Sequence, residues 1–226
     1  MVRVVSRAEA SAAVLDGGWR FLLGTLQSAV PVASLAAGAE VVTAAIRAAG
    51  EHADGHLRAD LRADRVVLSL QTLRLASLTS RDIQLAHQIS AALAELGHST
   101  GSQAGQRAVQ MLELAIDALD IAAIRPFWKA ALGYTHEPSA DGPTDPIVDP
   151  AGQGPAIWFQ RMTEPRPQRN RIHFDLCVPH DEVAGRIAAA LAAGGRLVSD
   201  RRAPAFWILA DAEGNEICLT TWQGRD

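Results

Sequence analysis

The second half of the chain contains one pattern of segments twice. A strand-like segment, QMLELAID, is followed by a helix-like segment, IAAIRPFWKAAL, and then by three short apolar stretches. The segments RIHFDLCV and DEVAGRIAAALAA, with three further stretches, repeat this order sixty residues later. A strand, a helix and three strands, repeated once, can close a shared sheet around a central cavity. The repeat therefore predicts a domain with a concave surface over residues 108–226.

Glycines at the ends of the two predicted helices support the same division of this half into two repeats. Gly133 ends the first predicted helix and Gly194 the second, as expected for residues that adopt left-handed backbone conformations. The six remaining strands are expected near Tyr134, near Ile147, and at 156–161, 196–199, 205–210 and 216–221. Each repeat is therefore predicted to be a βαβββ unit.

The first half is rich in Ala and Leu and is predicted to form a separate α+β domain, residues 1–97. Residues 98–107, HSTGSQAGQR, are small and polar and predict a linker. The expected helices are 7–15, 32–49 (closed by Gly50) and a segment that begins at Thr79 and ends at Gly97; the expected strands are two within 19–29 and one at 65–72.

Charge and composition limit the partners and the location. A formal net charge of −4 supplies no general attraction for nucleic acid or for an anionic membrane. No uninterrupted apolar run has a membrane-spanning length, and the first residues lack the apolar core of a signal peptide. Cys177 and Cys218 are the only cysteines, and without an export signal they are expected to stay reduced. A cytoplasmic protein with a small-molecule partner is therefore expected.

The phrases IRPFWKAALGY, AIWFQRM, NRIHFDL and ILADAEGNEICL resemble the glyoxalase-like branch of the vicinal oxygen chelate superfamily. The resemblance covers roughly residues 109–222 and implies four metal ligands on a cupped sheet, two from each repeat. The first-strand ligand positions fall on Glu113 and His173, and the last-strand positions fall on Gln160 and Cys218. Glu113 and His173 are good ligands for a divalent metal, whereas Gln160 is a poor one and a lone Cys218 is unusual for a hard metal.

The same residues have a second interpretation, as parts of a metal-free binding cup. A strand histidine is often a hydrogen-bonded structural residue, and a cysteine in an apolar strand is often a small filler. Trp158 and Trp207, with Phe159 and Phe206, would then line a pocket for a small molecule, although alternating aromatics are also typical of a core. The turn at 214–216 is expected to be a tight turn.

Residues 8–97 resemble pterin-4a-carbinolamine dehydratase, most clearly over SLTSRDIQLAHQIS and the preceding strand. The resemblance implies helices on one face of an antiparallel sheet, and dehydration of a hydroxylated tetrahydropterin by several imidazoles. The family's His-His-Pro positions fall on Gly55, His56 and Leu57, and its third histidine falls on Leu73. His56 remains, with Glu51 before it and Asp82 on the following helix. Glycine and leucine transfer no protons, so ordinary dehydratase activity is not expected.

Three functions follow from these patterns. The leading hypothesis is a small-molecule enzyme with lyase or isomerase chemistry, in which Glu113 and His173 act as base or metal ligand. The rival is a non-catalytic binding protein of sequestering or sensing type. The third is a residual pterin dehydratase that depends on His56. Both resembled families commonly self-associate, so a homo-oligomer is expected.

Overall fold

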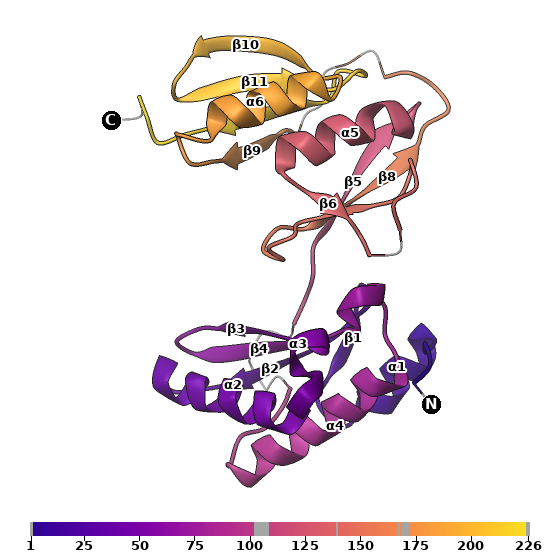
Figure 1. Cartoon of the computed structure of the whole chain (residues 1–226), viewed down its shortest axis with the longest axis vertical. Coiled ribbons are helices and arrows are strands. Elements are labelled where there is room, and N and C mark those ends of the chain that lie inside the picture. Colours follow the sequence, from indigo (N-terminus) through magenta and orange to yellow (C-terminus); the bar gives the residue numbers. More distant parts are fainter. Residues whose placement is uncertain (1, 102–108, 139, 167, 169–171, 225–226) are drawn as a thin grey trace. The chain divides into compact units, whose positions relative to one another are not determined.

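The computed structural model describes residues 2–101, 109–138, 140–166, 168 and 172–224. The chain divides into two compact units, residues 1–111 and 112–226, and each is described by itself (Figure 1). Residues 98–101 of the predicted linker belong to the first unit, and its residues 102–107 lie outside the described ranges. No helix in the described ranges is long and apolar enough to span a membrane.

The first unit contains a four-stranded antiparallel sheet in the order β1-β2-β4-β3. The strands are β1 (Arg20–Leu22), β2 (Thr25–Pro31), β3 (Leu57–Leu61) and β4 (Arg65–Leu70). The helices are α1 (Arg7–Val14), α2 (Leu35–Ala49), α3 (Ala53–His56) and α4 (Ser80–Glu95), with 3-10 turns at Gly50–His52 and Leu73–Leu75. Figure 1 shows α2 and α4 side by side along the sheet. The predicted α+β fold of this half is confirmed.

The core of the first unit follows from two sequence periods. On α4, Leu85, Ile89 and Leu93 recur at helical spacing and are fully buried. On β4, every second residue from Val66 to Leu70 is buried, as expected for a strand with one face on the core. These side chains belong to one apolar cluster, which holds the helices on the sheet.

The second unit contains two four-stranded sheets, in the orders β5-β8-β7-β6 and β10-β11-β12-β9. Its strands are β5 (Glu113–Ala118), β6 (Thr135–His136), β7 (Ile147–Val148), β8 (Ala156–Arg161), β9 (Phe174–Cys177), β10 (Arg196–Arg202), β11 (Phe206–Ala210) and β12 (Glu216–Thr220). Its helices are α5 (Ile121–Leu132) and α6 (Val183–Ala192). In each repeat the first strand pairs in parallel with the last, and the predicted duplication is confirmed.

The two repeats of the second unit share one core. Trp128 on α5 is buried and its ring meets Phe174 of β9 edge to face, 5.7 Å between centroids. The Trp128 indole Nε1 donates to Asp211 Oδ2 at 2.9 Å, and Asp211 is completely buried in the turn between β11 and β12. The carboxylate of Glu213, in the same turn, accepts from the backbone N–H groups of Leu119 and Asp120. The turn of the second repeat therefore closes over the start of α5 in the first.

Candidate functional site

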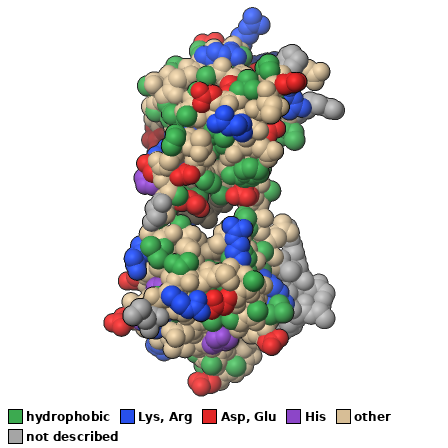
Figure 2. All heavy atoms as spheres, turned by 90° about the vertical axis from the view of Figure 1, so that its right-hand side faces the viewer, with side chains coloured by type: hydrophobic (Ala, Val, Ile, Leu, Met, Phe, Trp, Pro, Cys, Tyr) green, Lys and Arg blue, Asp and Glu red, His purple; other side chains and the backbone are tan. Residues whose placement is uncertain are grey.

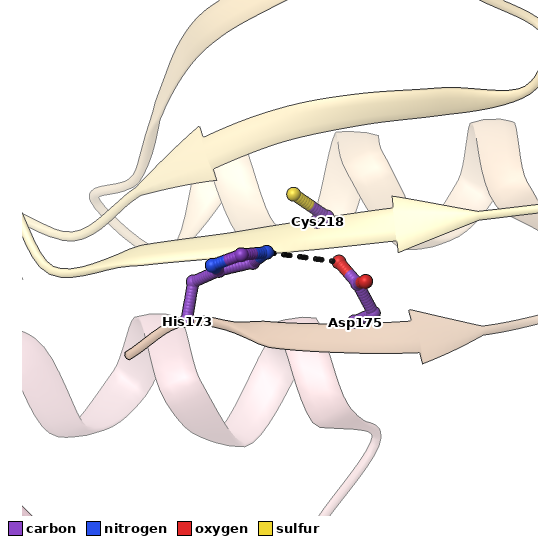
Figure 3. Close-up of side chains that lie close together, drawn as sticks. All are labelled: His173, Asp175 and Cys218. Carbon is purple, nitrogen blue, oxygen red and sulfur yellow. Dashed lines mark ion pairs between the residues drawn. The ribbon is translucent and has the colours of Figure 1, made fainter. Parts of the chain in front are cut away.

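Three potential metal ligands converge on the second repeat (Figure 3). β9 and β12 are parallel neighbours, and Asp175 lies directly opposite Cys218. His173 stands two residues before Asp175, so their side chains share one face of the extended chain. A nitrogen of His173, a carboxylate oxygen of Asp175 and the sulfur of Cys218 all lie within 4.8 Å of one another.

The donor set is accessible and mixed in chemistry. The side chains of His173 and Asp175 are 51% and 62% exposed, whereas Cys218 is buried beneath them. Imidazole, carboxylate and thiolate together suit Zn²⁺ and related transition metals better than Mg²⁺ or Ca²⁺. Three protein ligands leave a fourth position for water or for a substrate oxygen. The residues therefore fit a catalytic type of metal site.

The structure places Glu113 outside this group of three. Its negative charge instead acts on Glu137, the residue that follows β6. Burial raises the pKa of Glu137, and the negative charges of Glu113 and Asp145 raise it further. Gln160 is exposed on β8, opposite Asp117 of β5. Two of the four sequence-predicted ligand positions are therefore brought together, and the two from the first repeat are not members of that group.

The predicted aromatic lining has different surroundings at its two main positions. Trp158 is half-buried on β8, opposite Ala115. Trp207 is half-buried on β11 and packs against the apolar core of the unit.

Asp175 was not singled out from the sequence, although a usable signal was present. In a strand, residues two apart point to the same side, so the pair His173 and Asp175 in HFD presents two donors to one face. Only the parallel pairing of β9 with β12 adds Cys218, which is 43 residues beyond Asp175 in the sequence. That pairing is a property of the fold, and the spacing of residues along the sequence does not predict it.

The first unit brings His56 and Asp82 into contact. His56 Nδ1 lies 2.7 Å from Asp82 Oδ1, and the two side chains are 14% and 0% exposed. Asp82 Oδ2 also accepts from the Thr79 backbone N–H at 2.7 Å and from the Thr72 hydroxyl at 2.8 Å. The side chain of Glu51 is 89% exposed, and its carboxylate lies 3.9 Å from His52 Nε2.

This arrangement orients the His56 imidazole. Oδ2 of Asp82 accepts from a backbone N–H and a hydroxyl, and Oδ1 faces His56 Nδ1; we assign the hydrogen bond between them as donated by His56 Nδ1. Nε2 is then the nitrogen that exchanges protons with a ligand or with water. Asp82 also forms a capping box with Thr79 at the start of α4. This single carboxylate therefore both caps the N-terminus of a helix and orients the His56 ring.

Fold and site together define a protein of two different small α+β domains, each with a histidine–carboxylate pair. Residues 113–220 match the family model for the glyoxalase-like domain, and residues 3–92 match the model for pterin 4 alpha carbinolamine dehydratase. The chain therefore joins a pterin-carbinolamine-dehydratase-like domain to a glyoxalase-like domain. No curated protein sequence matches it.

Several solved structures are similar to this chain over about half its length. A glyoxalase/bleomycin resistance protein/dioxygenase family enzyme from Burkholderia phytofirmans is 18% identical, with 49% of this chain and 98% of that chain covered and a TM-score of 0.40. A glyoxalase-related enzyme from Fulvimarina pelagi is 16% identical, with 50% and 88% covered and a TM-score of 0.40. The fosfomycin resistance protein FosX from Mesorhizobium loti is 8% identical, with 51% and 93% covered and a TM-score of 0.41.

Proposed function

We propose that the C-terminal domain is a small-molecule enzyme of lyase or isomerase type, with a divalent metal ion held by His173, Asp175 and Cys218. The convergence of three donors within 4.8 Å carries this proposal. A metal ion bound there would polarise a substrate oxygen or activate water. The proposal includes a reducing, cytoplasmic setting, in which Cys218 forms no disulfide and can bind the metal as a thiolate.

The protein's own groups have separate roles in this proposal. His173 and Asp175 present their donors at the surface, so a ligand can approach them from solvent. Glu113 is the proposed base, an exposed carboxylate at the start of β5. Glu137, whose raised pKa favours its protonated form, reduces the charge repulsion around Glu113 when it holds its proton.

Metal content tests the proposal directly. Protein purified without a metal-affinity tag is expected to contain a stoichiometric divalent metal by elemental analysis. His173→Ala and Cys218→Ser should lose it, whereas His180→Ala, which changes an exposed histidine of the same unit, should retain it. Absence of metal from the unmodified protein, even after zinc is supplied, would reject the metal site. Ligand binding without turnover would then favour the sequestering or sensing protein.

Catalysis needs its own measurement once a substrate is found. Glu113→Gln and His173→Ala are each expected to lower kcat/KM by about a hundredfold or more, the usual effect of removing a general base or a metal ligand. If both variants turn over the substrate as the unmodified protein does, the catalytic roles are wrong even if the metal is present.

The contact between His56 and Asp82 favours a second candidate function in the N-terminal domain. An imidazole oriented by a buried carboxylate is an effective acid–base group near neutral pH, as dehydration of a hydroxylated tetrahydropterin requires. The test is dehydration of a 4a-hydroxytetrahydropterin by the full chain. Activity should disappear in His56→Ala and persist in His87→Ala, an exposed histidine on α4. No activity, or activity that survives His56→Ala, rejects this mechanism.

We also propose that the protein forms a homo-oligomer and binds no nucleic acid. Figure 2 shows acidic and basic side chains interspersed over the visible face, without one large basic area. This distribution and the net charge of −4 support the absence of a nucleic-acid surface. Light scattering measures the oligomer directly, and a monomeric mass would contradict that part of the proposal.

A further inference from the structure

His52 and His56 lie one helical turn apart in the first unit, where the 3-10 turn Gly50–His52 continues into α3. His52 has helical backbone angles, with φ of −88° and ψ of −9°, so the chain stays helical from one histidine to the next. Side chains four residues apart on a helix are neighbours. The two rings lie edge to face, with 6.1 Å between their centroids. The segment therefore brings two imidazoles together.

His56 is oriented in the way that is usual for a metal-binding histidine. Its Nδ1 lies 2.7 Å from Oδ1 of Asp82, a fully buried carboxylate. A metal-ligating imidazole almost always bonds its other nitrogen to a carboxylate, a carbonyl or water, which fixes the ring. The His56 side chain remains 14% exposed although its Nδ1 edge faces this buried carboxylate, so the accessible edge of the ring is the one that carries Nε2. Nε2 is therefore available as a ligand atom.

Glu51 offers a third donor beside the two imidazoles. One of its carboxylate oxygens lies 3.9 Å from His52 Nε2. The Glu51 side chain is 89% exposed and that of His52 is 35% exposed, so neither is held by tight packing. Two imidazoles and one carboxylate suit Zn²⁺ and similar divalent transition metals, and water can complete the coordination at an open surface.

The separation of the two rings is close to that of a chelating pair. With Zn–N bonds of about 2.0–2.1 Å in tetrahedral geometry, two ligating imidazoles have their centroids about 5 Å apart. The observed 6.1 Å therefore requires an approach of about 1 Å. Side-chain rotation of His52 can supply this movement, because His52 is the more exposed of the two histidines and Asp82 holds His56 in place.

We propose that Glu51, His52 and His56 bind a divalent transition-metal ion, with Zn²⁺ as the reference ion. Each histidine supplies Nε2, and Glu51 supplies a carboxylate oxygen. An ion on His56 Nε2 occupies the lone pair that proton exchange requires, so metal binding and acid–base catalysis by this histidine exclude each other. The site shares no residue with the metal site proposed in the C-terminal domain. It lacks a thiolate, so we expect it to bind more weakly and to lose its ion during purification.

A zinc titration of the full-length, chelator-treated protein at neutral pH tests this site. Nitrogen-15 NMR of the imidazole rings reports each histidine separately, because binding changes the chemical shift of the ligating nitrogen. The Nε2 signals of His52 and His56 are expected to shift together and to saturate at the same zinc concentration. The signals of His173 report the C-terminal site in the same titration, so failure of either metal proposal is a separate result.

Variants show whether the three side chains act as one site. His52→Ala should weaken zinc binding at His56 by about tenfold or more, since loss of even an outer-shell partner of a ligand costs roughly that much affinity. Glu51→Gln should weaken it several-fold. His87→Ala, which removes an exposed histidine on α4, should leave the affinity unchanged. Absence of a zinc-dependent shift at His56, or equal affinities in His52→Ala and His87→Ala, would overturn the proposal.

Discussion

His56 lies against Asp82 and His173 against Asp175, and the surroundings give these two histidine–carboxylate pairs different consequences. Asp82 beside His56 is fully removed from water, so loss of the Asp82 carboxylate would leave buried donors of His56, Thr72 and Thr79 without this acceptor. Asp175 beside His173 is largely exposed, and such a pair contributes little to stability because water screens it. We therefore expect Asp175 to contribute to ligand binding rather than to the stability of the fold.

Replacement of Asp82 by alanine is expected to lower the free energy of unfolding of the first unit by about 2–4 kcal/mol, because His56, Thr72 and Thr79 lose a common acceptor and α4 loses its cap. Urea denaturation measures the change. Asp54→Ala, at an exposed acidic position in the same unit, serves as the control and should stay within about 0.5 kcal/mol. Equal effects of the two changes would contradict this account of Asp82.

Glu137→Gln is expected to stabilise the second unit at neutral pH. The pKa of Glu137 is raised in the folded protein by burial and by Glu113 and Asp145, so folding is penalised at pH values above that pKa, where the side chain is charged. The penalty disappears as the pH falls below the ordinary value of about 4.3, where both states are protonated. Thermal unfolding at a series of pH values should show the gain shrinking with acidity. A gain that is the same at every pH would contradict this origin.

Among the elements, local sequence predicted those with strong periodicity or clear ends. Helix α5 was predicted with its observed bounds from the segment IAAIRPFWKAAL and from Gly133, which has φ of 70° and ends the helix; the structure adds that Asp120 caps its start. Strand β3 was missed, since four of its five residues are exposed and LRADL shows no apolar alternation. Its pairing with β4 comes from tertiary structure. The group of His173, Asp175 and Cys218 was also predicted only in part. Its members are brought together by strand pairing, which joins residues that are distant in the sequence.

Gly50 and Gly55 form a matched pair that tests whether the end of α2 requires glycine because of its positive φ. Gly50 has φ of 56°, and Gly55 in α3 has no positive φ; an added Cβ would meet nothing within 4 Å at either position. Gly50→Ala should therefore cost about 1 kcal/mol through the left-handed backbone alone. Gly55→Ala should be neutral or stabilising by up to about 1 kcal/mol, because alanine favours helix. Chemical denaturation of both variants measures the difference, and similar effects would refute the backbone explanation.

At the scale of the whole molecule, the two units have separate apolar cores with no residue in common. The segment after α4 belongs to the first of them. Thr100 Oγ1 donates to the Gly17 carbonyl, and Gly101 N–H donates to the Ala29 carbonyl at 3.0 Å. The change in composition after Gly97 marked the end of the helical pattern, but it did not reveal these backbone contacts.

Separate cores predict separate responses to core mutations. Leu85→Ala should lower the free energy of unfolding of the first unit by about 2–5 kcal/mol, the usual cost of such a cavity. Ile124→Ala should have a similar effect on the second unit. Hydrogen exchange that resolves individual amides should show accelerated exchange only in the unit that carries the change. Equal acceleration in both units would show that they unfold together.

The turn between β11 and β12 limits how this chain can be recombined. A graft that exchanged the second repeat for one from another protein would remove Asp211 and Glu213, while the first repeat kept the Trp128 indole N–H and the N–H groups of Leu119 and Asp120. A chimera would need carboxylates at the equivalent turn positions to supply those acceptors. The two repeats are therefore not interchangeable parts, although each contains four strands and one helix.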